Sequence, residues 1–153
     1  MHETFMRRAI SLAERGRGHT APNPLVGAVL VRDGKIIGEG FHAFYGGLHA
    51  ERAALEDCRH RGLSPAGASL YVTLEPCCHT GKQPPCTEAI LAAGIRAVFV
   101  GSSDPNPLVA GKGIAALRQG GIAVTEHVSE SACDALNAPF FHHIRTGLPF
   151  VLL

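Results

Sequence analysis

One histidine and two cysteines are spaced along this sequence in a way that is typical of a zinc site. His49 lies in the segment Leu-His-Ala-Glu, and Cys77 and Cys86 bound the run Cys-Cys-His-Thr-Gly-Lys-Gln-Pro-Pro-Cys. Imidazole nitrogen and thiolate sulfur are preferred ligands of Zn²⁺. Three such ligands, rather than four, predict an open site in which the ion keeps a position for a water molecule.

Glu51 follows His49 by two residues and is the candidate proton-transfer group. A carboxylate is a poor fourth ligand beside two thiolates, but it is well suited to moving protons between an activated water and a substrate. His-x-Glu followed by Pro-Cys and a second cysteine is the signature of the zinc-dependent nucleobase deaminases. That signature usually has two residues between its cysteines, whereas eight separate Cys77 from Cys86.

The longer spacing is informative, because the sequence around it closely resembles the pyrimidine deaminase domain of the bifunctional riboflavin-biosynthesis deaminase/reductase family. That family has the pattern Glu-Pro-Cys-x-His-x-Gly-Lys/Arg-x-Pro-Pro-Cys, which residues 75–86 match. Two further matches are Thr-Ala-Pro-Asn-Pro-Leu-Val-Gly at 20–27 and Asp-Pro-Asn-Pro-Leu-Val-Ala-Gly-Lys-Gly at 104–113. The resemblance extends from about residue 5 to residue 147.

The resemblance implies hydrolytic deamination of 2,5-diamino-6-(5-phosphoribosylamino)pyrimidin-4(3H)-one to 5-amino-6-(5-phosphoribosylamino)uracil, a step of riboflavin biosynthesis. Zinc would be held by His49, Cys77 and Cys86, and Glu51 would carry protons from the water to the ring nitrogen and the departing amine. The substrate-binding residues that the resemblance implies are Asn23, His42, His79, Lys82, Asp104 and Asn106.

Most of these binding roles have a plainer structural alternative. Asn23 sits between two prolines and can belong to a simple connector. His42 follows an expected strand, where a lone histidine is more often a surface residue. Asp104 and Asn106 are common turn formers, and Lys82 can be a solvated loop charge.

Two rival functions fit parts of the same pattern. The first is deamination of another nucleobase or nucleoside, although the near-neutral charge argues against tRNA as the substrate. The second is a structural zinc module that binds a partner protein. It requires a fourth protein ligand, for which Cys78 or His79 is the best candidate, and it leaves Glu51 without a role. We interpret Cys78 as a spectator and His79 as a group beside the metal ligands or the substrate.

The elements expected around the metal ligands bring them to one region of the fold. A helix over 49–61 places His49 and Glu51 near the positive end of its dipole, which favours negative charge. A strand over 69–74, rich in residues that favour strands, delivers Cys77 just after its end.

The whole pattern predicts a cytidine-deaminase-like, three-layer α/β/α fold with a mixed five-stranded sheet. Asp33-Gly34 predicts an antiparallel hairpin, and strand-helix alternation predicts parallel pairing of the last three strands. We expect strands over 26–31, 35–41, 69–74, 97–101 and 122–125, and helices over 3–15, 49–61, 86–94, 113–119 and 129–143.

Composition excludes several classes of protein. The chain has 153 residues, of which 46% are hydrophobic and 18% charged, so it can bury a core and is not expected to be disordered. A net charge of +1 without a basic run favours a small-molecule substrate over nucleic acid or a membrane surface. The loops that carry Lys82 and residues 104–106 favour a phosphorylated one. Five cysteines, an odd number, fit a reducing cytoplasm, and no apolar run is long enough to span a membrane.

The chain is expected to hold one domain and the beginning of another. Residues 1–146 are expected to form the zinc-dependent deaminase domain. In the family that the sequence resembles, the reductase domain begins at this point, so the resemblance implies that residues 147–153, which end in Phe-Val-Leu-Leu, are the start of a truncated C-terminal reductase domain; a free-standing deaminase is the alternative. No reductase site lies within the sequence itself. The sequence also leaves room for a homo-oligomer.

Overall fold

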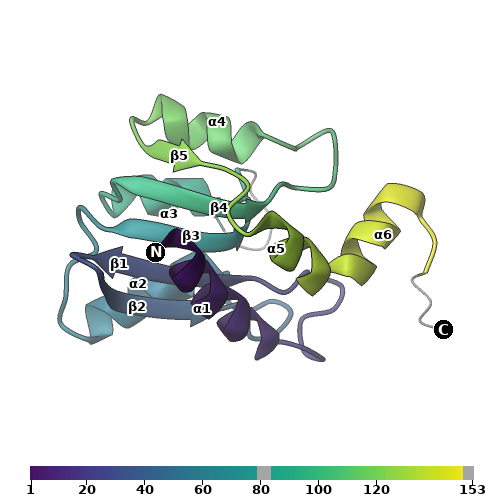
Figure 1. Cartoon of the computed structure of the whole chain (residues 1–153), viewed down its shortest axis with the longest axis horizontal. Coiled ribbons are helices and arrows are strands. Elements are labelled where there is room, and N and C mark those ends of the chain that lie inside the picture. Colours follow the sequence, from purple (N-terminus) through teal and green to yellow (C-terminus); the bar gives the residue numbers. More distant parts are fainter. Residues whose placement is uncertain (79–83, 150–153) are drawn as a thin grey trace.

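Five strands form one mixed sheet at the centre of the protein. The structure is a computed structural model that describes residues 1–78 and 84–149, and within these ranges the sheet has the order β2-β1-β3-β4-β5 (Figure 1). Antiparallel pairing joins β1 to β2 and to β3, and parallel pairing joins β3 to β4 and β4 to β5. The strands are β1 (Gly27–Arg32), β2 (Lys35–Phe41), β3 (Ser69–Leu74), β4 (Ala97–Ser102) and β5 (Ala123–Thr125).

The first two strands form the predicted hairpin. Asp33 and Gly34 connect them with φ angles of 54° and 74°. Positive φ at both central residues is the conformation of a type I′ turn, whose twist matches that of the flanking strands. The turn therefore sets the register in which Arg32 faces Lys35 and Val31 faces Ile36, and an irregularity between Leu30 and Val31 then shifts it by one residue, so that Gly27 faces Phe41.

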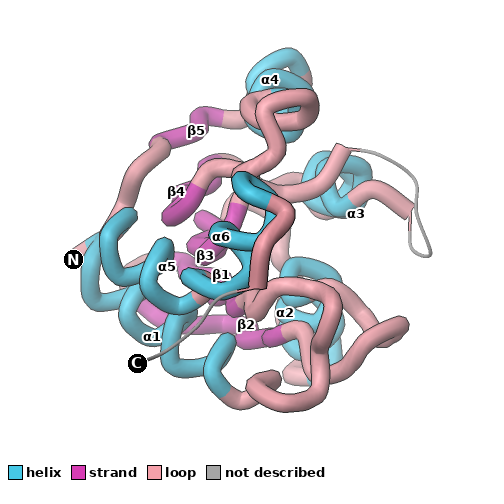
Figure 2. The backbone as a smooth tube through the Cα atoms, turned by 90° about the vertical axis from the view of Figure 1, so that its right-hand side faces the viewer, coloured by secondary structure: helices cyan, strands magenta, loops and turns pink. Residues whose placement is uncertain are grey.

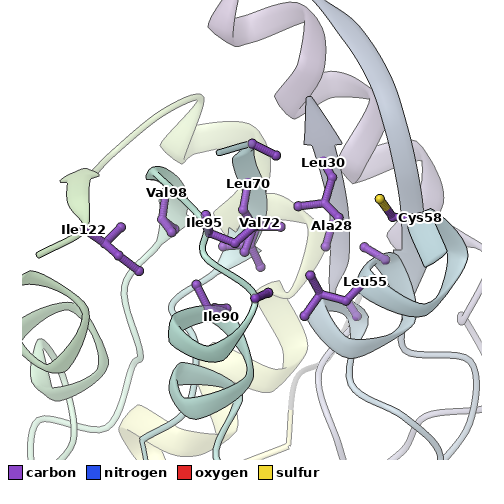
Figure 3. Close-up of a cluster of buried hydrophobic side chains, with 14 of the residues drawn as sticks. Ala28, Leu30, Leu55, Cys58, Leu70, Val72, Ile90, Ile95, Val98 and Ile122 are labelled. Atoms are coloured by element: carbon purple, nitrogen blue, oxygen red, sulfur yellow. The ribbon is translucent and has the colours of Figure 1, made fainter. Parts of the chain in front are cut away.

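Helices cover both faces of the sheet. Figure 2 shows α1 and α5 on one side and α2 and α3 on the other, and Leu117 of α4 packs into the same core cluster as α2 and α3. Figure 3 shows this cluster, in which alternate residues of β1, Ala28 and Leu30, lie beside Leu55 of α2. The helices are α1 (His2–Glu14), α2 (Ala50–His60), α3 (Cys86–Ala92), α4 (Lys112–Gln119), α5 (Glu130–Leu136) and α6 (Ala138–Thr146).

This arrangement confirms the predicted three-layer fold and the mixed sheet. None of the helices in the described parts of the chain combines the length and the apolar character needed to cross a bilayer.

Helix α2 lies unusually close to strand β2. A Cβ atom added to Gly40 would lie 2.4 Å from the backbone nitrogen of Ala54 and 2.6 Å from the carbonyl oxygen of Ala50. At Gly38 a Cβ atom would lie 2.5 Å from the carbonyl oxygen of Ala54. Only glycine fits at these two positions, so the strand sets how near α2 comes to the sheet.

The prediction of one helix over 129–143 was wrong, because the chain forms two helices there, α5 and α6. Asn137 separates them with φ −116° and ψ 26°, outside the helical region. Its side-chain oxygen accepts a hydrogen bond from the backbone N–H of Leu25 at 2.8 Å, and its side-chain nitrogen donates to the carbonyl of Leu25 at 2.7 Å. This buried pair of bonds outweighs continuation of the helix, and Pro139 lies in the first turn of α6, where its missing N–H costs no helical hydrogen bond.

We expect Asn137→Ala to destabilise the fold by about 2–3 kcal/mol, because it leaves both backbone groups of buried Leu25 without their partners. Urea denaturation followed by circular dichroism measures the change. Ser131→Ala, at an exposed position of α5, is the matched control and should have almost no effect. A loss of stability in Asn137→Ala no larger than in the control would contradict the role of this side chain.

Candidate functional site

Three potential metal donors meet at one end of the sheet. His49 is the residue immediately before α2, Cys77 follows the end of β3, and Cys86 is the first residue of α3. Their donor atoms lie within 4.8 Å of one another. Among the described residues Cys78 does not belong to this group, although it is adjacent to Cys77 in the chain. The structure thus brings together the residues that the sequence spacing singled out.

The spacing of the donor atoms fits a tetrahedral zinc ion. Nδ1 of His49 lies 3.1 Å from Sγ of Cys86 and 3.8 Å from Sγ of Cys77. At the bond lengths usual for zinc, a tetrahedral ion separates a nitrogen ligand from a sulfur ligand by about 3.6 Å. One imidazole and two sulfur atoms are also the donor types that zinc prefers.

The two cysteines differ in protonation when no metal is bound. The backbone N–H of Cys86 donates to Sγ of Cys77 at 3.3 Å. Hydrogen bonds from the Cys86 thiol and from His49 lower the pKa of Cys77 to about 4. The hydrogen bond that the Cys86 thiol donates to Cys77 raises the pKa of Cys86, and the hydrogen bond between His49 and Cys77 raises the pKa of His49. Cys77 is therefore the thiolate of the metal-free site, and a metal would displace the proton of Cys86.

Glu51 is buried beside this cluster. It lies in the first turn of α2, is 4% exposed, and forms a hydrogen bond with Cys86. Burial raises the pKa of Glu51 to about 7, since removing the carboxylate from water disfavours its charged form. A carboxyl group with a pKa near neutrality can both accept and donate a proton.

The cluster opens into a cavity of about 380 Å³. His49, Glu51 and Cys77 are among the residues that line it. The cavity is large enough for a small organic ligand of the usual kind.

Asn23 and His42, both predicted from the sequence, lie in the cavity wall and contact each other. Nδ1 of His42 lies 2.9 Å from the carbonyl oxygen of Leu48, which can only accept, so Nδ1 carries the proton. In the neutral ring Nε2 then accepts the hydrogen bond from the Asn23 amide nitrogen at 3.1 Å. The bond directs the Asn23 amide nitrogen toward His42 and fixes the orientation of the amide. The buried position of His42 also excludes the plain surface role considered above.

The predicted residues Asp104 and Asn106 have different environments. Asp104 lines the cavity, but Asn106 is not among the lining residues. Each side chain also accepts a hydrogen bond from the backbone two residues later, Asp104 from Asn106 at 2.9 Å and Asn106 from Leu108 at 3.0 Å. Both are therefore turn formers, and Asp104 alone of the two also faces the cavity. His79 and Lys82 lie outside the described residues.

Glu75 and Phe140 are among the cavity-lining residues that were not predicted as site residues. Glu75, which immediately follows β3, lines the cavity and accepts hydrogen bonds from three backbone N–H groups. Phe140 reaches the cavity from α6. The Glu-Pro-Cys motif contained Glu75, but nothing in the sequence indicated its distant partners, and Phe140 lies in a stretch without a recognisable motif.

Comparison with known families decides the classification. Residues 1–102 match the family described as the cytidine and deoxycytidylate deaminase zinc-binding region. The chain belongs to the cytidine and deoxycytidylate deaminase family. The range matched within this deaminase family includes the three metal donors and Glu51, whereas Asp104 and Phe140 of the cavity wall lie beyond it.

Individual relatives agree with this classification and with the resemblance found in the sequence. The riboflavin biosynthesis protein RibD of Actinobacillus pleuropneumoniae is 54% identical over 149 residues, which are 97% of this chain and 39% of that protein. RibD of Bacillus amyloliquefaciens is 52% identical over the whole chain and 40% of its own length. The chain thus spans about two fifths of the curated relatives that it matches.

The fold also matches that of a solved structure. It is that of the diaminohydroxyphosphoribosylaminopyrimidine deaminase/5-amino-6-(5-phosphoribosylamino)uracil reductase of Thermotoga maritima, which is 50% identical. The TM-score is 0.93, over 97% of this chain and 42% of that one.

We expect the Cys77 thiol of this deaminase to keep its reactivity in acid when metal has been removed. An ordinary thiol with a pKa of about 8.5 loses reactivity about tenfold per pH unit below that value. Because the pKa of Cys77 is lowered to about 4, its labelling rate with iodoacetamide should stay nearly constant from pH 8 to pH 5 and fall only near pH 4. Peptide mass spectrometry measures this rate.

The urea-unfolded chain is the reference for this measurement, since Cys77 there has no partners. Cys86→Ala should shift the fall in Cys77 reactivity to higher pH, because it removes the thiol whose hydrogen bond lowers the pKa of Cys77 most, while the bonds from His49 and from the backbone of residue 86 remain. Parallel pH profiles for Cys77 in the folded and unfolded chains would refute the predicted thiolate.

Proposed function

We propose that this chain is the hydrolytic deaminase of 2,5-diamino-6-(5-phosphoribosylamino)pyrimidin-4(3H)-one and forms 5-amino-6-(5-phosphoribosylamino)uracil. The observation that carries the proposal is the position of Glu51, a buried carboxyl group with a pKa near 7 beside three metal donors, in the wall of a cavity. A closed structural site has no use for such a group. A hydrolytic deaminase needs it for proton transfer.

His49, Cys77 and Cys86 would hold a zinc ion in this site. When bound, zinc lowers the pKa of a water molecule to about 7 and so supplies a nucleophile at neutral pH. The donor types and their spacing support zinc in preference to Mg²⁺ or Ca²⁺, which take oxygen ligands.

Glu51 would move the protons of the reaction. It takes a proton from the attacking water and delivers one to the ring nitrogen, so that the carbon bearing the amino group can become tetrahedral. It then takes a second proton, from the hydroxyl group added to that carbon, and passes it to the departing amino group, so that the C–N bond breaks, ammonia leaves and the carbonyl group of the product forms. The pKa near 7 suits both directions of transfer, because neither protonation state is strongly favoured at neutral pH.

The cavity wall would orient the substrate. Asn23 and His42 face the ligand space near the metal donors, and Asp104 faces it from the loop after β4. We assign Asn23 and His42 to the base and Asp104 to the ribose-phosphate end. Asn106 supports the turn that carries Asp104. For His79 and Lys82, the proposed contacts with the substrate rest on the resemblance alone.

The names of the relatives support this choice of substrate over other bases. The protein of Thermotoga maritima, which is 50% identical, is named as the deaminase of this ribotide and the reductase of its product. By analogy we propose that a reductase domain follows in the full-length protein, beginning near residue 147. We also propose that the enzyme works in the cytoplasm, where its free cysteines stay reduced.

A second candidate function is deamination of cytidine or deoxycytidylate, which the family description includes. It keeps the same metal donors and Glu51 and differs only in the wall that contacts the substrate.

Ammonia release by the zinc-loaded chain tests the proposal. We expect release from the diaminopyrimidine ribotide and none above background from cytidine, deoxycytidylate or guanine. Release only from one of the other bases would leave the catalytic assignment intact and refute the substrate. If none of the four substrates reacts with zinc confirmed bound, the proposed activity of the isolated chain is wrong.

Glu51→Gln should nearly abolish turnover while zinc remains bound. The amide has the shape of the carboxyl group but cannot transfer the protons, so kcat should fall about 10²-fold to 10⁴-fold. Glu56→Gln, an exposed position on the same helix, is the control and should react at the wild-type rate. More than about a tenth of wild-type kcat in Glu51→Gln would overturn the assigned proton transfer.

Zinc content should depend on the three donors and not on Cys78. His49→Ala and Cys86→Ser should each leave far less than one equivalent of zinc after dialysis, because a donor is missing from the cluster. Cys78→Ser should retain zinc and activity. Elemental analysis of the purified variants measures this, and loss of zinc in Cys78→Ser would favour a closed structural site.

A further inference from the structure

We propose that Glu75 is a positioning residue of the deaminase: its carboxylate fastens the segment 104–113 to the end of β3 and so holds Asp104 in the cavity wall. The kinetic consequence rests on the function proposed above. The positioning itself rests on contacts within the chain, which can be tested without a substrate.

The carboxylate of Glu75 accepts hydrogen bonds from three backbone N–H groups of this segment. Oε1 accepts from Asp104 at 3.3 Å and from Gly111 at 3.1 Å. Oε2 accepts from Gly113 at 3.1 Å. The three donors span almost the whole segment, so one side chain closes it into a loop with both ends attached to the same point.

Burial makes these bonds necessary to Glu75 as well as to the segment. The residue is only 7% exposed, and a buried carboxylate without hydrogen bonds is costly. Hydrogen bonds that involve an ionised group are roughly twice as strong as those between neutral groups. The segment therefore stabilises the carboxylate while the carboxylate orders the segment.

Gly113 shows how close the far end of the segment lies to β3 and its continuation. A Cβ atom at this position would lie 2.0 Å from the carbonyl oxygen of Pro76 and 3.4 Å from Oε2 of Glu75. A side chain would push the segment away from the carboxylate. The contact thus requires glycine at 113 and an acceptor at 75 together.

Asp104 is held from two directions. Its backbone N–H donates to Glu75, and its side-chain oxygen accepts from the backbone N–H of Asn106. The first bond places the residue relative to β3, which leads to Cys77, and the second sets the local turn. Because Asp104 lines the cavity, Glu75 links the position of a wall residue to the strand that leads to a metal donor.

The segment also lies beyond the range that matches the deaminase family, which ends at residue 102. Glu75 is inside that range. We infer that Glu75 joins the shared catalytic part of the fold to a segment that contributes to substrate recognition.

Amide hydrogen exchange tests the positioning directly. In Glu75→Gln one of the two oxygen positions becomes an NH₂ group, which cannot accept from the facing N–H. We expect the amides of Asp104, Gly111 and Gly113 to exchange at least about tenfold faster than in wild type, with the amides of β1 as internal reference. Unchanged exchange at all three amides would overturn the proposal, whatever the enzyme's substrate.

Wild-type exchange keeps the proposal testable if Glu75→Gln does not fold. Gly111 is exposed, so its amide should exchange slowly only because it donates to Glu75. Rapid exchange at Gly111 in the wild-type chain would overturn the anchoring.

Kinetics of the ribotide reaction test the consequence for recognition. Glu75→Gln should raise KM about tenfold and change kcat less than about twofold, since the proton-transfer group is untouched. Glu56→Gln is again the control. A loss of about tenfold in kcat with an unchanged KM would show that Glu75 acts on the chemical step and would refute the positioning role.

A double-mutant cycle separates positioning through Asp104 from direct contact of Glu75 with the substrate. Asp104→Asn should raise KM by itself, and adding Glu75→Gln should then change KM less than about twofold. If the two substitutions instead raise KM by factors that multiply in the double variant, Glu75 does not act through Asp104 and the proposal is wrong. If wild type proves inactive on the ribotide while exchange behaves as expected, the proposed function fails and the anchoring stands.

Discussion

The close approach of α2 to β2 is the constraint on which the site depends. His49 and Glu51 belong to the start of α2, whereas the cysteines belong to β3 and α3. The helix can bring its histidine to the sulfur atoms only because Gly38 and Gly40 leave no side chain between strand and helix. A methyl group at either position would move the helix outward and with it the imidazole. The chemistry of the site thus depends on two residues that never face it.

Two buried glutamates at the same end of the sheet show how surroundings assign different roles to one chemical group. Glu75 accepts hydrogen bonds from three backbone N–H groups, which replace its contacts with water and let it hold a loop in place. For Glu51 the loss of water dominates, so its proton is easily exchanged near neutral pH. The cavity wall therefore contains one carboxyl group that holds a loop and one that can transfer protons.

Features determined by local pattern could be predicted from the sequence. The hairpin at Asp33-Gly34, the parallel strands and the meeting of His49, Cys77 and Cys86 follow from turn chemistry, alternation and ligand spacing. Features determined by contacts between residues far apart in the sequence could not be predicted. The break between α5 and α6 depends on bonds from Asn137 to a residue 112 positions away, and the partners of Glu75 lie 29 to 38 positions away. Periodicity within a window of the sequence carries no information on such pairs.

The bonds between Asn137 and Leu25 also join the start of the chain to the helix that completes the cavity. Asn23 and Phe140 face the same cavity from opposite ends of the chain. The metal donors and the strands β1 to β3 leave the ribosome well before α6, whereas a domain folds as a unit. A nascent chain that ends before α6 lacks the wall that Phe140 provides. The cavity wall that faces the metal donors can therefore be completed only after α6 has been synthesised.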